Sequence, residues 1–431
     1  MPPASQTVSE RGRQPRSLTD YHSAGNILYF ISVLCYNGSM SAMNKSQAVR
    51  KVCVAMNMAS YAGRLKLAGI IEFLSKNRHW TLELLMADRD FSVRTLKRAR
   101  LSGIDGMILL NFPPRRMCAE IARARIPAVV ESSTWSLSSE KLTKLLFDVK
   151  DMADVASRHF LSRHAFKSFC FIDSVDGNGR IDTYSPDRRN AFMAALARQF
   201  IECASFPMNA RDLARRIADM ARPVAVLAAN DLAARAAARA AMARDMRIPE
   251  DVAILGIDNN PEICESEPPA LDSIAQDFRG AGRLAASLLE RLMNGDTRVP
   301  ETNFYGTGGI VLRGSTVASS PHWPLVKSAL EFIDNAACSG ACVPDVADHL
   351  GVSRRLLDLR FHEILGYSVL DAIRERRIKE VKHLLSTTDM PIARISDATG
   401  FRNPNHLKNL FKQQMSQTMR EWRASYPQRG K

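Results

Sequence analysis

The chain has 431 residues and a formal charge of +14, with 59 Lys and Arg against 45 Asp and Glu. This length exceeds one ordinary domain, so two or three domains are expected, and the basic balance favours a polyanionic partner. Eight cysteines are scattered singly, which excludes a disulfide framework and is typical of a reducing cytoplasm. Cys338 and Cys342 are one helical turn apart, but no second pair accompanies them, so no metal site is expected.

The N-terminal part contains one apolar run, ILYFISVLCY, at residues 27–36. The run is too short to cross a bilayer, which takes about 20 residues, and a long polar lead containing Asp20 fits a signal peptide poorly. We therefore expect no membrane segment and a cytoplasmic protein. Residues 1–46 are expected to be a disordered or artefactual extension, with Met40 or Met43 as the true start.

Residues 47–313 follow a repeated order of strand, loop and helix. Helices are predicted at residues 64–76, 152–164, 188–200 and 232–246. The strands between them are predicted from the runs VCVAM, TLELLM, GMILL, PAVV, KLLFD, SFCFI, PVAVLAA and VAILGI. This alternation predicts an α/β fold with parallel sheets in two lobes, and ligands are expected beyond the carboxyl ends of the strands.

The pattern changes at residues 314–324, GSTVASSPHWP, whose Ser and Pro content is typical of a linker. After it, strands are no longer predicted. Residues 325–431 are expected to form an all-α domain of short helices, because so sharp a change of composition marks a domain boundary.

Two segments of the all-α part share one plan: VPDVADHLGVSRRLLDLRF at residues 343–361 and PIARISDATGFRNPNHLKNLF at residues 391–411. Each predicts a short helix, a glycine turn, an N-capping residue and a second helix, which is the helix-turn-helix arrangement. The turn glycines are Gly351 and Gly400, the caps are Ser353 and Asn403, and Pro404 occupies the first helical position.

Residues 325–426 therefore resemble the DNA-binding domain of the AraC/XylS family of transcription regulators. That family joins two helix-turn-helix units through a long helix, which would be residues 369–385 here. The matching positions include Ile395, Ala398, Gly400, Phe401, Leu407, Phe411, Lys412 and Trp422. The chain departs from the family at Ser416 and Met419, where glycine and proline are usual, so the closing turn is expected to differ.

The resemblance implies which side chains meet DNA. Base contacts fall on Arg355, Asp358, Leu359, Asn405, His406 and Asn409, and phosphate contacts on Arg354, Arg360, Lys408 and Lys412. Asparagine suits adenine edges and arginine suits guanine, while phosphate contacts set affinity without reading sequence. The competing interpretation is a merely solvated helix face, which the paired architecture disfavours. Two inserted helices would meet successive major grooves about 34 Å apart.

The order and spacing of three segments in the α/β part are characteristic. The segments are AANDLAARAAARAAM at residues 228–242, RIPEDVAILGIDN at residues 247–259 and LDSIAQDFRGAGRLAASLLERLMNG at residues 271–295. Together they resemble the ligand-binding domain of the LacI/GalR regulators and of periplasmic sugar-binding proteins. A sensor of this type ahead of an AraC-type domain resembles one group in particular, the xylose operon regulators.

A sugar needs carboxylate and amide acceptors, guanidinium donors and an aromatic ring, gathered at strand ends. The resemblance implies sugar contacts at Arg188, Asp231 and Asp258, with Asp148 and Gln276 near the lobe crossovers, and Tyr61 and Arg64 follow the first strand. Other interpretations compete: Asp231 caps its helix, Arg188 pairs with Asp187, and Tyr61 packs between the lobes. Leu145 and Phe147 are expected in the core.

The combined prediction is a sequence-specific DNA-binding transcription regulator controlled by a monosaccharide, xylose or a related sugar, bound between the lobes. Sugar binding would shift the population of lobe arrangements and so the presentation of DNA-binding domains in a homodimer. Expected partners are double-stranded DNA, the sugar and RNA polymerase; no cofactor is expected.

The alternative is a sugar-active enzyme of α/β fold with an accessory helical domain. No Gly-rich phosphate loop, G-x-S-x-G elbow or H-E-x-x-H motif supports it. The GTGG segment at residues 306–309 does not open a predicted helix, so it is weak as a phosphate site. A periplasmic solute-binding protein would leave the last hundred residues without a role.

Overall fold

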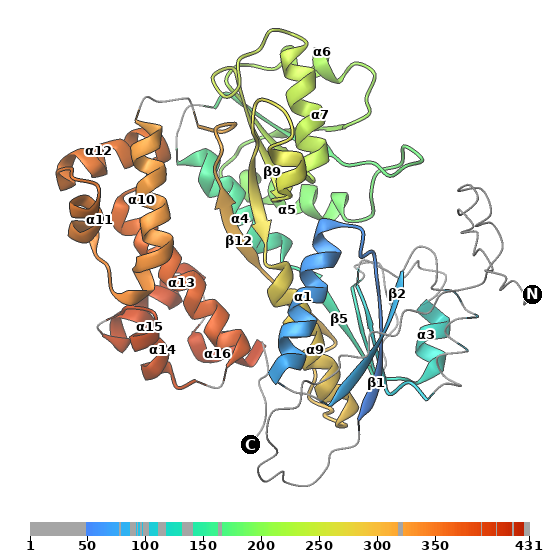
Figure 1. The fold of residues 1–431 in the computed structure, drawn as a ribbon. Helices are drawn as coiled ribbons and strands as arrows, with labels where there is room; N and C mark the ends of the chain where they lie inside the picture. Colours follow the sequence, from blue (N-terminus) through green and yellow to red (C-terminus); the bar gives the residue numbers. More distant parts are fainter. Residues whose placement is uncertain are drawn as a thin grey trace, which may run out of the picture.

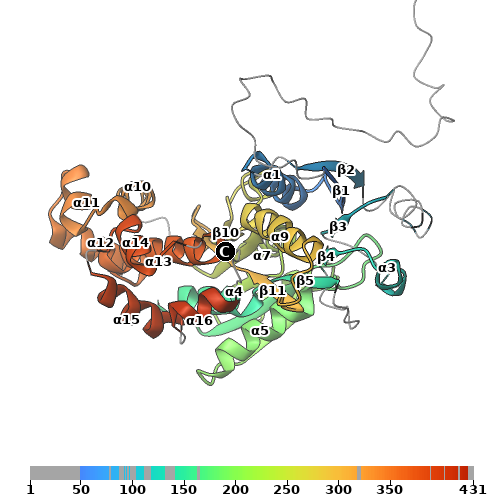
Figure 2. The ribbon, with the colours of Figure 1, turned by 90° about the horizontal axis from the view of Figure 1, so that it is seen from below.

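A computed structural model describes residues 49–76, 79–86, 103–110, 118–131, 141–162, 166–317, 322–388, 390–401, 403–415 and 418–425, together with Ser92, Arg94 and Lys97. The expected extension at residues 1–46 lies outside the described residues. Two α/β lobes lie together, and a group of helices lies to one side of them in both views (Figure 1, Figure 2). This arrangement agrees with the α/β-then-helical fold predicted from the sequence.

The first lobe contains a six-stranded sheet of order β11-β5-β4-β3-β1-β2, in which all strand pairs are parallel. Alternate residues of β1 face opposite sides: Val54 packs towards helices α1 and α9, and Cys53 towards α3. The elements are β1 (Arg50–Met56), α1 (Tyr61–Lys76), β2 (Trp80–Met86), β3 (Gly106–Leu109), α3 (Cys118–Ala124), β4 (Ala128–Val130), β5 (Leu142–Phe147), α9 (Phe278–Met293) and β11 (Thr302–Tyr305).

Helices α1 and α9 approach each other at backbone distance because two glycines face across their interface. A Cβ atom on Gly69 would lie 2.0 Å from the Arg279 carbonyl oxygen, and one on Gly282 would lie 1.9 Å from that of Lys66. Both positions therefore require glycine. This contact joins a helix early in the chain to one more than 200 residues later, and it closes the first lobe.

The second lobe contains a sheet of order β12-β10-β9-β8-β6-β7, parallel except for the antiparallel pair of β10 and β12. Helices α6 and α7 cover one face, and α4 and α5 cover the other. The elements are α4 (Val149–Leu161), β6 (Ser168–Asp173), α5 (Ser185–Ala197), β7 (Cys203–Pro207), α6 (Leu213–Ala218), β8 (Val224–Ala228), α7 (Asp231–Met242), β9 (Val252–Asp258), α8 (Pro261–Cys264), β10 (Asp272–Gln276) and β12 (Thr307–Val311).

The eight strands predicted from apolar runs are present, but four further strands were not predicted: β7, β10, β11 and β12. Their sequences, CASFP, DSIAQ, TNFY and TGGIV, contain polar residues or glycine in place of an apolar run. They are strands because neighbouring strands supply hydrogen-bond partners, which local composition does not reveal.

The chain passes between the lobes three times: at Asp148 after β5, at Asp277 after β10, and at Gly306 between β11 and β12. The crossovers are hydrogen-bonded to one another. The Asp148 amide donates to the Tyr305 carbonyl oxygen at 2.9 Å, and the Asp277 amide donates to that of Gly306 at 3.2 Å. Three adjacent segments therefore form the hinge between the lobes.

A buried carboxylate, that of Asp272, binds the chain segment that follows β12. Asp272 is fully buried, and its Oδ1 accepts from the amides of Arg313 and Gly314, the latter at 2.7 Å. Its Oδ2 accepts from the Thr316 amide at 2.8 Å and from the Thr316 hydroxyl. The first residues of the expected linker are therefore attached to β10, and the domain boundaries themselves stay a prediction.

The helical region contains two small cores joined by one long helix, α13. The first core gathers α10, α11 and α12, and the second gathers α14, α15 and α16. The helices are α10 (Trp323–Ala336), α11 (Val343–His349), α12 (Arg354–Leu365), α13 (Val369–Thr387), α14 (Ile392–Ala398), α15 (Pro404–Met415) and α16 (Met419–Ser425). No helix in the described ranges has both the length and the apolar character needed to cross a bilayer.

Both helix-turn-helix units have the turn chemistry predicted from the sequence. Gly351 and Gly400 have positive φ angles of 64° and 73°, which favour glycine. The Ser353 hydroxyl accepts from the Leu356 amide at 3.2 Å, and Asn403 Oδ1 accepts from the Asn405 amide at 2.8 Å. Met419, where the family usually has proline, is buried in the second core, so its apolar side chain fills that position.

Asp231, predicted either to cap α7 or to bind ligand, is 1% exposed. Its Oδ1 accepts from the Ser273 hydroxyl at 2.5 Å and its Oδ2 from the Asn260 amide at 2.7 Å. The preceding residue caps the helix instead, since Asn230 Oδ1 accepts from the Ala233 amide at 2.8 Å. Burial, with a further contribution from Asp258, raises the pKa of Asp231 to about 7.

Replacing Asp272 should destabilise the second lobe strongly. Asp272→Ala leaves the amides of Arg313, Gly314 and Thr316 without their acceptor, so we expect the free energy of unfolding to fall by about 3 kcal/mol or more. Urea unfolding measures this change. Asp219→Ala, at an exposed carboxylate, is the control and should leave stability unchanged; equal losses in both variants would contradict the assignment.

Asp231 should give the stability a specific pH dependence. Its pKa of about 7 in the folded chain lies above the ordinary 3.8, so the folded state holds a proton that the unfolded state has released. The free energy of unfolding should therefore fall as the pH rises from about 4 to about 7. Asp231→Asn should flatten this slope in urea unfolding series, whereas Asp219→Asn should not. A slope unchanged by Asp231→Asn would show that other groups cause it.

Candidate ligand site and nucleic-acid interface

A chain of polar side chains crosses the junction between the lobes near the crossovers. On the second lobe, Gln276 Nε2 donates to Asp258 Oδ1 at 2.5 Å, and Arg188 Nη1 lies 3.4 Å from the same oxygen. On the first lobe, Lys66 Nζ donates to the Glu131 carboxylate at 2.6 and 2.7 Å. We call the six connected residues Lys66, Glu131, Tyr305, Gln276, Asp258 and Arg188 the junction network.

Tyr305 connects the two halves of the junction network. Its hydroxyl lies 2.9 Å from Glu131 Oε1 and 3.1 Å from Gln276 Oε1. A single phenolic proton serves one of these acceptors at a time. Tyr305 is the last residue of β11, so this connection lies directly at the third crossover.

Aromatic rings surround the charged groups. The Arg188 guanidinium lies 4.6 Å from the ring centre of Tyr184 and 5.3 Å from that of Phe147. The Lys66 ammonium lies 5.4 Å from the ring centres of both Tyr305 and Phe278. Cations over ring faces are stabilised electrostatically, so the rings support both cations.

A second polar group adjoins Arg188 on the second lobe. Asn230 Nδ2 donates to the Tyr184 hydroxyl at 2.8 Å and to the Ser174 hydroxyl at 3.0 Å. Arg188 Nη1 also donates to the Ala229 carbonyl oxygen at 2.5 Å. The segment at the end of β8 is thus held by side chains from the loop after β6 and from the start of α5.

Burial raises the pKa of three side chains at this site, one carboxyl group and two phenols. It raises the pKa of Asp258, although the Arg188 guanidinium and the Gln276 amide oppose the rise. Burial likewise raises the pKa of Tyr184 to about 12, and burial with the Glu131 charge raises that of Tyr305 well above its ordinary value. Both tyrosines therefore remain neutral hydrogen-bonding groups at physiological pH.

The structure brings three of the seven predicted ligand residues together, namely Arg188, Asp258 and Gln276. Arg188 pairs with Asp258 and not with Asp187 as the competing interpretation held. Tyr61 packs edge-on against Phe278 at 6.3 Å, and Arg64 is exposed and pairs with Glu262 of the other lobe at 2.8 Å. Both lie where α1 faces the second lobe.

The remaining two predicted ligand residues have structural partners. Asp148 caps α4 at the first crossover, accepting from the Lys150 and Asp151 amides at 3.1 and 3.0 Å. Asp231 is held by Ser273 and Asn260 beneath the Asp258 loop. Asp231 therefore lies where it positions that loop, which itself carries the strained φ of 106° at Asp258.

Several junction residues were missed from the sequence. Lys66 lies within the apolar helix α1, Glu131 follows a short strand, and Tyr305 lies on an unpredicted strand. Phe147 packs against the cores of both lobes as expected, but it is only half-buried and also lies against Arg188 and Tyr305, whereas Leu145 is fully buried. Asn230 carried a usable signal, since it directly follows the predicted strand PVAVLAA.

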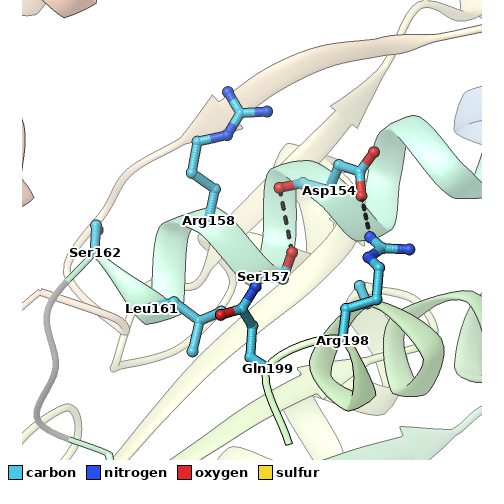
Figure 3. A pocket seen from close by; sticks show the side chains of 8 residues that line it. Asp154, Ser157, Arg158, Leu161, Ser162, Arg198 and Gln199 are labelled. Carbon is cyan, nitrogen blue, oxygen red and sulfur yellow. Dashed lines mark hydrogen bonds and ion pairs between the residues drawn. The ribbon is translucent and has the colours of Figure 1, made fainter. Parts of the chain in front are cut away.

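A separate pocket lies between α4 and α5, lined by Asp154, Ser157, Arg158, Leu161, Ser162, Ala195, Arg198 and Gln199 (Figure 3). Two of its charged lining residues form an ion pair with each other, in which Arg198 Nη2 lies 2.7 Å from Asp154 Oδ1. None of the junction network lines it, so it is a different place from the candidate ligand site.

Helix α12 carries the first predicted DNA face. Arg354 and Arg355 are exposed, and Leu359 is 56% exposed, although leucine is ordinarily buried. Asp358 Oδ1 accepts from the Val369 amide at 3.1 Å, and Arg360 pairs with Glu363 at 2.6 Å. The first three side chains point to solvent, whereas the last two have partners within the domain.

Helix α15 carries the second predicted DNA face, and its polar side chains are all exposed: Asn405, His406, Lys408, Asn409 and Lys412. Leu407 and Phe411 are fully buried on the opposite side. Gln413 is also exposed, four residues after Asn409, and helical spacing could have identified it. The helix therefore presents amide and cationic groups along one side, as major-groove reading requires.

Comparison with known proteins matches both halves of the chain. The family profile of the periplasmic binding protein-like domain matches residues 157–316, and that of a helix-turn-helix domain matches residues 346–425. The xylose operon regulatory protein of Escherichia coli (strain K12) is 25% identical over 388 residues, covering 86% of this chain and 96% of that protein. The xylose operon regulatory protein of Haemophilus influenzae is 31% identical over 200 residues, covering 46% and 52%.

Solved structures agree at the level of fold. A xylose-binding transcription activator has a TM-score of 0.51 with 23% identity, covering 86% of this chain and 97% of that one. A transcriptional regulator in complex with cellobiose has a TM-score of 0.52 with 21% identity, covering 62% of this chain and 85% of that one. These relatives are transcription regulators, so the enzyme alternative is set aside. The chain is therefore similar over most of its length to transcription regulators, and it combines a periplasmic binding protein-like domain with a C-terminal helix-turn-helix domain.

Proposed function

We propose that this regulator changes its DNA binding in response to a monosaccharide, D-xylose or a close relative, bound at the lobe junction. The observation that carries the proposal is the junction network itself, in which carboxylates, an amide, a guanidinium and an ammonium from both lobes meet beside aromatic rings. The relatives named as xylose regulators support the choice of sugar.

The chemistry of the network suits a polyhydroxylated ligand. A sugar hydroxyl both donates and accepts, so it can replace a contact between a carboxylate such as Asp258 and a donor such as Arg188. About 30% of the Asp258 side chain is exposed, which leaves it accessible beside the buried arginine. Phe147 and Tyr184 offer ring faces for the apolar side of a pyranose.

The position of the network supplies a regulatory mechanism. Its members come from both lobes and meet at the third crossover, so a ligand there has a different affinity for different lobe arrangements. Such differential affinity is what shifts a conformational equilibrium. A homodimer would present two DNA-binding domains whose spacing depends on that equilibrium, and RNA polymerase is a proposed partner of the DNA-bound form.

DNA reading is assigned to the exposed faces of α12 and α15. Asn405 and Asn409 are one turn apart on the exposed side of α15 and suit adenine edges, while Arg355 suits guanine. Lys408 and Lys412 are assigned to phosphates. Asp358 is assigned a supporting role, because it holds the start of α13.

The sugar assignment predicts the effect of removing the Asp258 charge. At about 100 times its Kd, D-xylose should stabilise the wild-type chain by about 2.7 kcal/mol in thermal unfolding. Asp258→Asn should weaken D-xylose binding by about tenfold or more while leaving sugar-free DNA affinity unchanged. Asp219→Asn is the matched control at an exposed carboxylate. Failure of a panel of monosaccharides, D-xylose included, to stabilise the wild-type chain would overturn the proposed function.

The DNA assignment predicts two distinguishable kinds of variant. Asn405→Ala with Asn409→Ala should relax base preference at about two positions in a binding-site selection. Lys408→Ala should weaken binding to all sequences alike and lower the salt slope by about one. An unchanged base preference in the asparagine variant would remove α15 as the reading helix.

A further inference from the structure

The connecting helix α13 does more than join the two helix-turn-helix units, because it also lies against the sensor. Two of its lysines, Lys379 and Lys382, are one turn apart and contact the second lobe beside the third crossover. Neither DNA reading nor sugar binding accounts for these lysines.

Lys382 pairs with a carboxylate that also holds the hinge. Its ammonium lies 3.1 Å from Asp151 Oδ1, and both side chains are mostly buried, with exposed fractions of 19% and 18%. The other oxygen of Asp151 accepts from the Thr307 amide at 2.9 Å and from its hydroxyl at 2.8 Å. Burial would raise the pKa of Asp151, but Lys382 and Thr307 outweigh it and keep the pKa below its ordinary value.

Lys379 contacts β12, the strand that begins with Thr307, at a main-chain carbonyl group. Its ammonium donates to the Gly308 carbonyl oxygen on β12. A Cβ atom on Gly306 would lie 4.0 Å from the Lys382 ammonium, and one on Gly309 would lie 4.0 Å from that of Lys379. The GTGG segment at residues 306–309 is therefore a side-chain-poor surface on which the two lysines of α13 lie.

Two further contacts attach the helical region to the same lobe. The Ser162 hydroxyl at the end of α4 lies 3.4 Å from the Leu365 carbonyl oxygen, and a Cβ atom on Gly366 would lie 2.6 Å from the Ser162 carbonyl oxygen. His159 of α4 contacts the Thr316 hydroxyl at 2.8 Å. Contacts near the start of α4, at Asp151, and near its end, at His159 and Ser162, thus involve the helical region or the segment leading to it.

We propose that Lys379 and Lys382 clamp the DNA-binding domain to the second lobe at the third crossover, so that a rotation of the lobes moves this domain as one body with the second lobe. The contact with Asp151 places the clamp at the pivot, because the same carboxylate holds Thr307, the residue after Gly306. The sugar-dependent part of this inference rests on the proposed function. The clamp itself does not, since its contacts are made between side chains and main chain of the protein alone.

The test compares the full-length wild-type chain with Lys379→Gln/Lys382→Gln. Asp151→Asn removes the charge from the other side of the contact, and Lys327→Gln removes one charge from an exposed lysine of α10 as the matched control. Circular dichroism and thermal unfolding confirm that each variant is folded. Small-angle X-ray scattering without sugar or DNA reports whether the domain stays docked, and DNA affinity with and without D-xylose reports the coupling.

Both clamp variants should have a larger radius of gyration than the wild type and the control. Their DNA affinity should respond to D-xylose by less than about twofold, against about 5- to 150-fold for a typical coupled pair. D-xylose should still stabilise them thermally. An unchanged radius of gyration, or a D-xylose response that is retained or enlarged, would overturn the clamp. A wild-type chain that responds to none of a panel of monosaccharides, D-xylose included, would overturn the proposed function, and the scattering result would then test the clamp by itself.

Discussion

The structure depends on one constraint: strands of two different sheets, β11 and β12, are separated by a single residue, Gly306. Tyr305, on one side of it, belongs to the junction network through Glu131 and Gln276. Thr307, on the other side, is held by Asp151, which also contacts α13. Three consecutive residues therefore connect the candidate ligand site, the hinge and the surface on which the DNA-binding domain lies.

The junction network is better understood as a source of specificity than of stability. Buried ion pairs such as Lys66 with Glu131 carry a desolvation cost that their attraction roughly offsets, whereas breaking one partner away is costly. A cluster of this kind accepts only a ligand that restores its hydrogen bonds. Arg188 and Lys66 each lie over aromatic rings, which stabilise both cations electrostatically.

The helical region shows how small cores can present large polar faces. Its short helices bury a few apolar residues each, such as Leu357 and Phe361 on α12, and leave the opposite side exposed. Two such cores share α13, whose residues contribute to both. The spacing of α12 and α15 is therefore set by one continuous helix, and the same helix contacts the sensor. The two candidate DNA-reading helices are therefore connected to the sensor through the same helix.

Local features of the chain were determined by its sequence alone. Hydrophobic periodicity, the caps at Ser353 and Asn403, and the turns at Gly351 and Gly400 depend on residues within one or two helical turns of each other. Two helix-turn-helix units, an alternating α/β region, and candidates such as Arg188 near the start of a helix and Asp258 at the end of a strand could therefore be predicted.

Only the tertiary structure decided which distant segments meet. Lys66 and Glu131 are 65 residues apart, Tyr305 and Glu131 are 174 apart, and Lys382 and Asp151 are 231 apart. Strands β11 and β12 exist because β5 and β10 offer free edges, and nothing in TNFY or TGGIV encodes that pairing. Local sequence patterns encode local hydrogen bonding and burial, whereas the partners of a buried charge are chosen by how whole elements pack.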